Sequence, residues 1–101
     1  MRTPLAADLL LLARALMPVP AVGRMTLARR LIREATEAQV HFEATHRCHP
    51  TFGDGSLMAR VLYLRPVAEP VARDPDFLDA MCIAAQALRT HYTARLAASQ
   101  L

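Results

Sequence analysis

Apolar residues recur every three or four positions along most of this chain, which is the spacing that gathers side chains on one face of an α-helix. The first such stretch begins at Thr3-Pro4, because threonine favours the N-cap and proline the first helical position, and it should end near Met17. A helix that is apolar on this much of its circumference belongs at the centre of a domain or against a second subunit. Its main stripe is formed by Leu5, Leu9, Leu12 and Leu16.

The second predicted helix is the longest and extends from Arg24 to His46, after Pro18 and Pro20 have ended the first one. Its length would be about 34 Å. Pro20 is an alternative start, in which case Gly23 would lie inside the helix as a kink. The predicted buried face consists of Met25, Ala28, Ile32, Ala35, Gln39, Phe42 and His46.

Two more helices follow. A short one starts at Asp54 or Ser56 and ends near Leu64, and the prolines after it predict an extended connector over residues 66–74. The last helix has the clearest start in the chain, with Asp74 as the N-cap and Pro75 in the first position. Its predicted buried face consists of Phe77, Leu78, Met81, Ala85, Leu88, Tyr92 and Leu96.

These elements predict an all-α fold: one domain over residues 1–101, with four helices, a structured Gly-Asp-Gly-Ser loop and a Pro-rich connector. No stretch alternates apolar and polar residues for long enough to predict a strand. Apolar residues make up 53% of the sequence. Because the core of so small a domain cannot hide them all, a subunit interface is expected.

Charge and cysteine content limit the kinds of partner and the cellular compartment that the sequence predicts. The net charge is +3, and all 12 basic residues are arginine. This is a mildly basic balance that leaves nucleic acid or an acidic protein as partner. Cys48 and Cys82 do not form a disulfide framework, so free thiols in the cytoplasm are expected. The apolar run Leu9–Leu12 is too short to cross a membrane, so no membrane association is predicted.

The loop between the second and third helices carries most of the unusual residues. A functional interpretation makes its backbone amides and Ser56 an anion-binding nest, whereas a structural one makes Asp54 or Ser56 a helix cap and the glycines a tight turn. The structural interpretation is favoured, because the motif lacks the lysine of a P-loop and the strand of a nucleophile elbow. The loop residues concerned are His49, Pro50, Phe52, Gly53, Asp54, Gly55 and Ser56.

A second interpretation of the same region is chemical. His46, Cys48, His49 and Asp54 could form a small metal-binding or hydrolytic cluster. Their spacing is unlike that of common zinc sites, and neighbouring residues rarely reach attack geometry. The alternative expectation is that His46 lies on the buried helix face and that Cys48 is a small buried apolar group. No catalytic residue, metal or cofactor is therefore predicted.

Arginines on the second helix raise the question of nucleic-acid binding. A phosphate-tracking face would use them, but Glu34, Glu37 and Glu43 are interleaved and weaken the local field. Direct DNA binding is kept as an alternative function. The arginines concerned are Arg24, Arg29, Arg30, Arg33 and Arg47.

The motif His49-Pro50 followed by residues 53–58, Gly-Asp-Gly-Ser-Leu-Met, resembles a family of small alphaproteobacterial proteins of the Rhodobacterales. The resemblance covers nearly the whole chain. It implies a partner subunit of a DNA-binding regulator, tied to nucleoid organisation and gene transfer agent production. Under this resemblance, the motif residues shape the fold or the partner surface and do not catalyse.

Together these observations predict a non-enzymatic interaction subunit of a hetero-oligomeric, nucleoid-associated regulatory complex in the cytoplasm. The partner would be a DNA-binding protein, a second copy of the chain, or both. DNA would be contacted indirectly or weakly. No small-molecule substrate is predicted.

Overall fold

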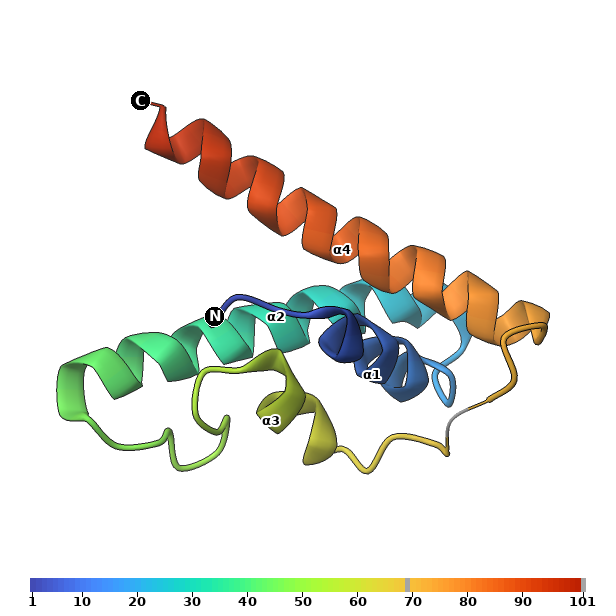
Figure 1. Cartoon of the computed structure of the whole chain (residues 1–101), viewed down its shortest axis with the longest axis horizontal. Coiled ribbons are helices and arrows are strands. Elements are labelled where there is room, and N and C mark those ends of the chain that lie inside the picture. The colour runs from blue at the N-terminus through green and yellow to red at the C-terminus, as the bar shows by residue number, and fades with distance from the viewer. Residues whose placement is uncertain (69, 101) are drawn as a thin grey trace.

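The computed structural model describes residues 1–68 and 70–100 and contains four α-helices (Figure 1). They are α1 (Ala6–Leu16), α2 (Ala21–Thr45), α3 (Leu57–Leu62) and α4 (Pro75–Ser99). The described residues form no strand, so the predicted all-α four-helix fold is confirmed. The connector predicted over residues 66–74 joins α3 to α4, although its position 69 lies outside the described residues.

The short helix α1 occupies the centre of the molecule. It contacts all three other helices, and its contact with α4 is the most extensive. Leu12 and Leu16 are fully buried, whereas Leu5, which the sequence placed on the same stripe, is exposed because it precedes the helix. Of the two environments expected for this helix, the structure shows the domain centre.

The start of α1 differs from the prediction, because a different side chain bonds the free amides at this end of the helix. Thr3 does not cap the helix; instead, Asp8 accepts a hydrogen bond from the Leu5 amide at 2.8 Å. The other carboxylate oxygen of Asp8 accepts one from the Met58 amide, at the start of α3, at 3.0 Å. Amides at helix starts lack partners within the helix and favour a negative charge. One buried carboxylate therefore joins the starts of α1 and α3.

The long helix α2 starts at Ala21, with Pro20 in the N-cap position, which is the alternative start considered from the sequence. Ala28, Ile32 and Ala35 are buried as predicted. His46 is not: it is exposed and adopts a left-handed backbone conformation (φ 59°) that ends the helix. A residue in this conformation turns the chain away, so its side chain cannot continue the helix face.

The buried face of α4 also differs from the prediction. Its N-cap is Asp74, as expected, and the carboxylate accepts a hydrogen bond from the Asp76 amide at 3.0 Å. However, Ala85 and Leu96 are exposed, and Leu78 is 45% exposed. Phe77 is buried as predicted, but the other buried side chains are small, while Met81, Leu88 and Tyr92 are partly buried beside them. The buried residues are Phe77, Ala80, Ala84 and Ala87.

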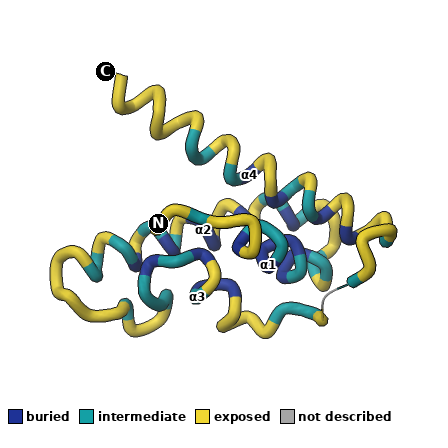
Figure 2. Tube along the Cα trace, in the orientation of Figure 1, coloured by how far each residue is buried: buried dark blue, intermediate teal, exposed yellow. Residues whose placement is uncertain are grey.

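After Ala87, α4 is only partly covered: Leu88 and Tyr92 still pack beside the core, and the later turns are exposed. No residue of α4 after this position is buried, and Figure 2 shows the last turns fully exposed. The central helix has 11 residues and α4 has 25, which correspond to about 16 Å and 37 Å. The second half of α4 therefore lies beyond the reach of α1.

Arg24 connects three segments of the chain and is 5% exposed. Its Nε donates to the Val19 carbonyl at 2.9 Å, and its Nη2 donates to the Met17 carbonyl at 3.1 Å. Nη2 also lies 2.8 Å from the carboxylate of Asp76, in the first turn of α4. This one guanidinium ties the α1–α2 connection to the start of α4.

Replacing Arg24 with methionine should lower the free energy of unfolding by about 2–4 kcal/mol, because two carbonyls lose a charged donor. Urea denaturation followed by circular dichroism measures this change. Arg33→Met on the same helix is the matched control; Arg33 is exposed, so its replacement should change stability by less than about 0.5 kcal/mol. Equal effects of the two substitutions would contradict the structural role of Arg24.

Candidate interaction groove

The loop between α2 and α3 uses its polar groups to hold its own conformation. Nδ1 of His49 accepts hydrogen bonds from the Thr51 and Phe52 amides, both at 3.0 Å, and the His49 amide donates to the Gly53 carbonyl at 2.8 Å. The imidazole also stacks on the Phe52 ring, with 4.5 Å between the ring centroids. Pro50 is exposed in the turn that these bonds close. Because Nδ1 accepts two hydrogen bonds, it is occupied and cannot act as a metal ligand or base in this conformation.

The Gly53–Ser56 turn starts α3. Ser56 is the N-cap, and its hydroxyl accepts a hydrogen bond from the Ala59 amide at 3.1 Å. Asp54, the other candidate cap, accepts one from the Ser56 amide at 2.9 Å. Hydrogen bonds from Ser56, and then the positive charge of Arg2, lower the pKa of the Asp54 carboxyl below its ordinary value. A carboxylate held at this place leaves the turn poorly suited to an anion.

The loop and α3 are fastened to α2 by an ion pair. Arg60 is 6% exposed and donates from Nε and Nη2 to one oxygen of Glu34, at 3.0 and 2.8 Å. Its guanidinium carbon also lies 5.3 Å from the centroid of the Phe52 ring. The first half of the loop, α3 and the middle of α2 therefore meet at Arg60.

The alternative interpretation, a cluster of His46, Cys48, His49 and Asp54, is not assembled as a metal-binding group. His46 and Cys48 are exposed, so the expectation of a buried Cys48 is wrong; the chain passes outside the core after the left-handed turn at His46. Cys82, on α4, is exposed as well. Within residues 1–68 and 70–100, no three histidine, cysteine or acidic side chains are arranged to hold a metal ion.

The five candidate arginines do not share one surface. Arg24 is buried in the structural role described above, which removes it from any nucleic-acid face. Arg47 lies in the loop after α2, away from the others in sequence and exposed to solvent. Arg29, Arg30 and Arg33 are exposed on successive turns of α2, and Arg30 lies 3.8 Å from Glu34.

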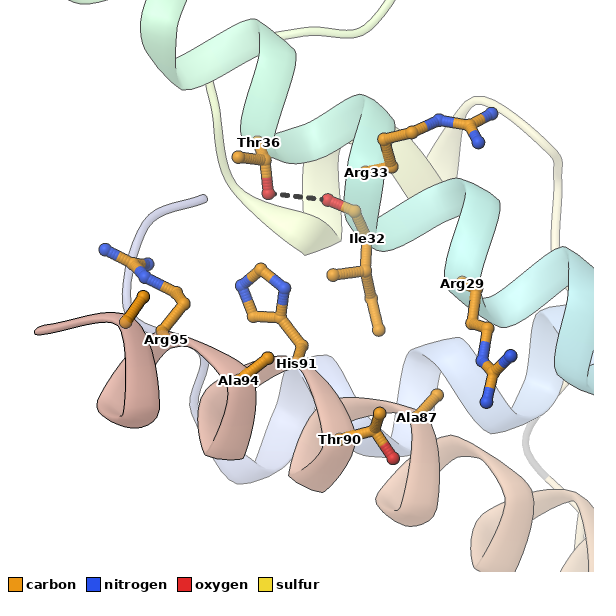
Figure 3. A pocket seen from close by; sticks show the side chains of 10 residues that line it. Arg29, Ile32, Arg33, Thr36, Ala87, Thr90, His91, Ala94 and Arg95 are labelled. Carbon is orange, nitrogen blue, oxygen red and sulfur yellow. Dashed lines mark hydrogen bonds between the residues drawn. The ribbon is translucent and has the colours of Figure 1, made fainter. Parts of the chain in front are cut away.

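Arg29 and Arg33 stand on the rim of a groove between α2 and the second half of α4 (Figure 3). The groove has a volume of about 440 Å³ and is open to solvent. Ile32, from α2, and His91, from α4, point into it, while Arg95 stands on the α4 side. The remaining lining residues are small: Thr36, Ala87, Thr90, Ala94 and Ala98.

His91 is the polar group inside the groove. Its Nε2 atom is buried and has no hydrogen-bond partner among the described residues. Burial, then the positive charges of Arg95 and of the N-terminal amine, lower the pKa of His91 below its ordinary value. The same causes disfavour the charged imidazole, and the arginines on the rim supply the positive charge of the groove.

The α4 wall of this groove was not predicted from the sequence. The predicted buried face of α4 was assigned mainly from large residues, among them Leu88, Tyr92 and Leu96. The available signal was the series of small residues Ala87, Thr90, Ala94 and Ala98, which recur every three or four positions. Such a series marks a helix face that another helix can approach closely.

The geometry defines a small all-α domain with an open groove between two of its helices. The chain belongs to the family described as a domain of unknown function, DUF7742, which matches residues 2–88. This range includes the α2 rim of the groove and Ala87, but not the α4 positions after Leu88. Neither the curated proteins nor the solved structures compared with the chain include a match. Among the described residues, no helix is both long enough and apolar enough to span a membrane.

Gly55→Ala should lower the free energy of unfolding by about 2–4 kcal/mol. Gly55 has φ +97°, and an added Cβ would lie 2.9 Å from the Cα of Gln39 in the α2 backbone. Gly23→Ala is the control, because Gly23 lies in the first turn of α2 and its nearest neighbour is a side-chain atom, Cγ1 of Val19, at 3.2 Å. It should be neutral or stabilising by up to about 1 kcal/mol.

Thermal and urea denaturation of the two alanine variants provide the comparison. If Gly55→Ala were as stable as the parent chain, the close packing of the loop on α2 would be incorrect.

Proposed function

We propose that this protein is a non-enzymatic interaction subunit, and that it binds a partner protein in the groove between α2 and α4. One observation carries the proposal: the second half of α4 faces α2 across an open groove whose floor is formed by Ile32, Ala87 and Ala94. Helices expose apolar faces in this way where another element covers them.

The first half of α4 shows what such a cover looks like. There, α1 packs against both α4 and α2, and Phe77, Ala80 and Ala84 are buried in the contact. Farther along α4, no helix among residues 1–68 and 70–100 takes the place of α1. A helix supplied by another protein would complete the same three-helix packing.

The resemblance carried by the loop motif extends the proposal to the identity of the partner. It favours a DNA-binding regulator in a nucleoid-associated complex, with a role in gene transfer agent production. In that arrangement the partner contacts DNA, and this chain contacts the partner. The conformation of the loop supports a structural role for the motif, since its polar groups are bonded within the loop and to the start of α3.

Site-specific photo-cross-linking tests partner binding. A benzophenone amino acid at Thr90, in the groove, should give one discrete protein adduct in cells that produce the chain. The same group at Ala72, which is exposed in the connector, should not give it. The captured protein is then identified and purified, and Ala94→Trp, which fills the groove, should weaken its binding by about tenfold or more. Identical adducts from both positions, or no effect of Ala94→Trp, would contradict the proposal.

Direct DNA binding is the second candidate. The observation that favours it is the exposure of Arg29, Arg30 and Arg33 on successive turns of α2, with Arg95 across the groove. Glu34 weakens this surface, because it is paired with Arg60 and lies 3.8 Å from Arg30. The field of the arginines is thus partly neutralised where a phosphate would lie.

Under this second function, the purified chain would bind duplex DNA with an affinity that falls steeply with salt. Replacing Arg29, Arg30 and Arg33 with glutamine should then reduce the affinity. The slope of its salt dependence should fall by the equivalent of about three phosphate contacts. Fluorescence anisotropy with a labelled duplex, measured over a range of salt concentrations, gives both values. Unchanged binding of the triple variant would exclude this face.

A further inference from the structure

The walls of the groove are two regular helical stripes. On α2, the stripe runs from Arg29 to Thr36 and corresponds to about 10 Å of helix. On α4, it runs from Ala87 to Ala98 and corresponds to about 16 Å. Within each stripe, lining residues recur every three or four positions, and some of them are adjacent in sequence, such as Ile32 and Arg33. Two such stripes, facing one another across an open groove, form the kind of surface that a helix pair presents to a third helix.

Size supports a helix as the occupant. The α4 wall contains Ala87, Thr90, Ala94 and Ala98, so the backbone of an occupant can approach it closely. Larger side chains of the occupant would then fill the space beside Ile32. A groove of about 440 Å³ that is open along its length suits about three turns of an amphipathic helix better than an enclosed small molecule.

Charge decides what kind of helix fits. Three guanidinium groups stand around the groove, from Arg29 and Arg33 on one side and Arg95 on the other (Figure 3), and none of the lining residues is acidic. In Figure 3, Arg33 extends outward from α2, where it would meet the flank of an occupant rather than its buried face. Acidic residues along both flanks of the occupant would pair with these groups.

A second copy of this chain fits poorly. Its own overhanging element, the second half of α4, has no acidic residue between Ala80 and Gln100 and carries Arg89 and Arg95. Inserting that helix into the groove would bring arginine against arginine.

His91 adds a polar requirement inside the groove. Its buried Nε2 atom is without a partner among the described residues. Because this atom is covered, an occupant gains a hydrogen bond to the imidazole only if the ring turns toward the groove. A glutamate or glutamine at the edge of the occupant's apolar face could reach it, which again favours a helix with acidic and polar flanks.

We infer that the groove between α2 and α4 binds an amphipathic helix of about three turns, with an apolar face and acidic flanks, from another protein. This inference rests on the proposed function and specifies the chemistry of the partner. The arginines select the occupant by its charge, while Ile32 and the small residues of α4 supply the apolar contact.

Two designed fluorescent peptides of about 16 residues test the inference directly. Both carry leucines on one helical face; one carries glutamates on its flanks, and the other carries lysines. The acidic peptide should bind the full chain at least about tenfold more tightly than the basic one in fluorescence anisotropy. In heteronuclear NMR spectra it should shift the amide signals of Thr36, Thr90 and Ala94.

Two triple variants separate the groove from general charge. Arg29, Arg33 and Arg95 changed to glutamine should weaken binding of the acidic peptide by about tenfold. Arg47, Arg65 and Arg73 changed to glutamine remove the same charge from exposed sites outside the groove, and should leave the affinity within about twofold. All six positions are exposed, so circular dichroism should show both variants folded. Ala94→Trp should abolish binding sterically.

Each alternative result has a definite meaning. Equal affinity for the two peptides, equal loss in the two triple variants, or no binding up to about 1 mM would overturn the acidic-helix inference. If the peptides failed but a protein captured by cross-linking at Thr90 lost its binding to the Ala94→Trp variant, the proposed function would stand with a partner of different chemistry. If duplex DNA shifted the same amide signals and the acidic peptide did not, nucleic acid would replace a helix as the ligand.

Discussion

The difference in length between the central helix and its neighbours determines the layout of this protein. Helix α1 has 11 residues, whereas α2 and α4 each have 25. Burial of the leucines of α1 therefore fixes only one part of each long helix, and both long helices extend past it. The overhanging part of α2 is covered by the chain itself, whereas the overhanging part of α4 forms one wall of the open groove.

The overhang of α2 is covered from within the chain. The loop after His46 turns back along the helix, Gly55 packs against Gln39, and Arg60 pairs with Glu34. Asp8 then connects this layer to α1 through the Met58 amide. Beside the overhang of α4, the chain supplies only its N-terminal residues, Met1 and Thr3, near Tyr92 and Arg95, and the small residues of α4 face α2 across the open groove. The same chain thus closes one side of its core with its own loop and leaves the other side available to a partner.

Local signals predicted the helices well, because caps and prolines act over a few residues. Asp74-Pro75 and Ser56 started the helices that the sequence assigned to them. Burial was harder to predict, because it depends on which helix lies opposite. On α4, alanines and not leucines form the closest contact, and at the start of α1 a carboxylate replaces the expected threonine cap. The ion pairs of the buried arginines Arg24 and Arg60 join residues far apart in sequence, so no local pattern marked them as structural.

Arg24 has a mechanical consequence for the groove. It binds the α1–α2 connection and Asp76 together, so α4 is anchored at its first turn and unsupported at its far end. The buried contacts of α4 extend from this anchor to Ala87, so only the segment from Leu88 to Ser99, about 18 Å long, lies beyond them. A bend confined to this segment would change the width of the groove without disturbing the residues buried between α1 and α4. Selectivity for a partner would then depend more on the charges of Arg29, Arg33 and Arg95 than on a fixed groove shape.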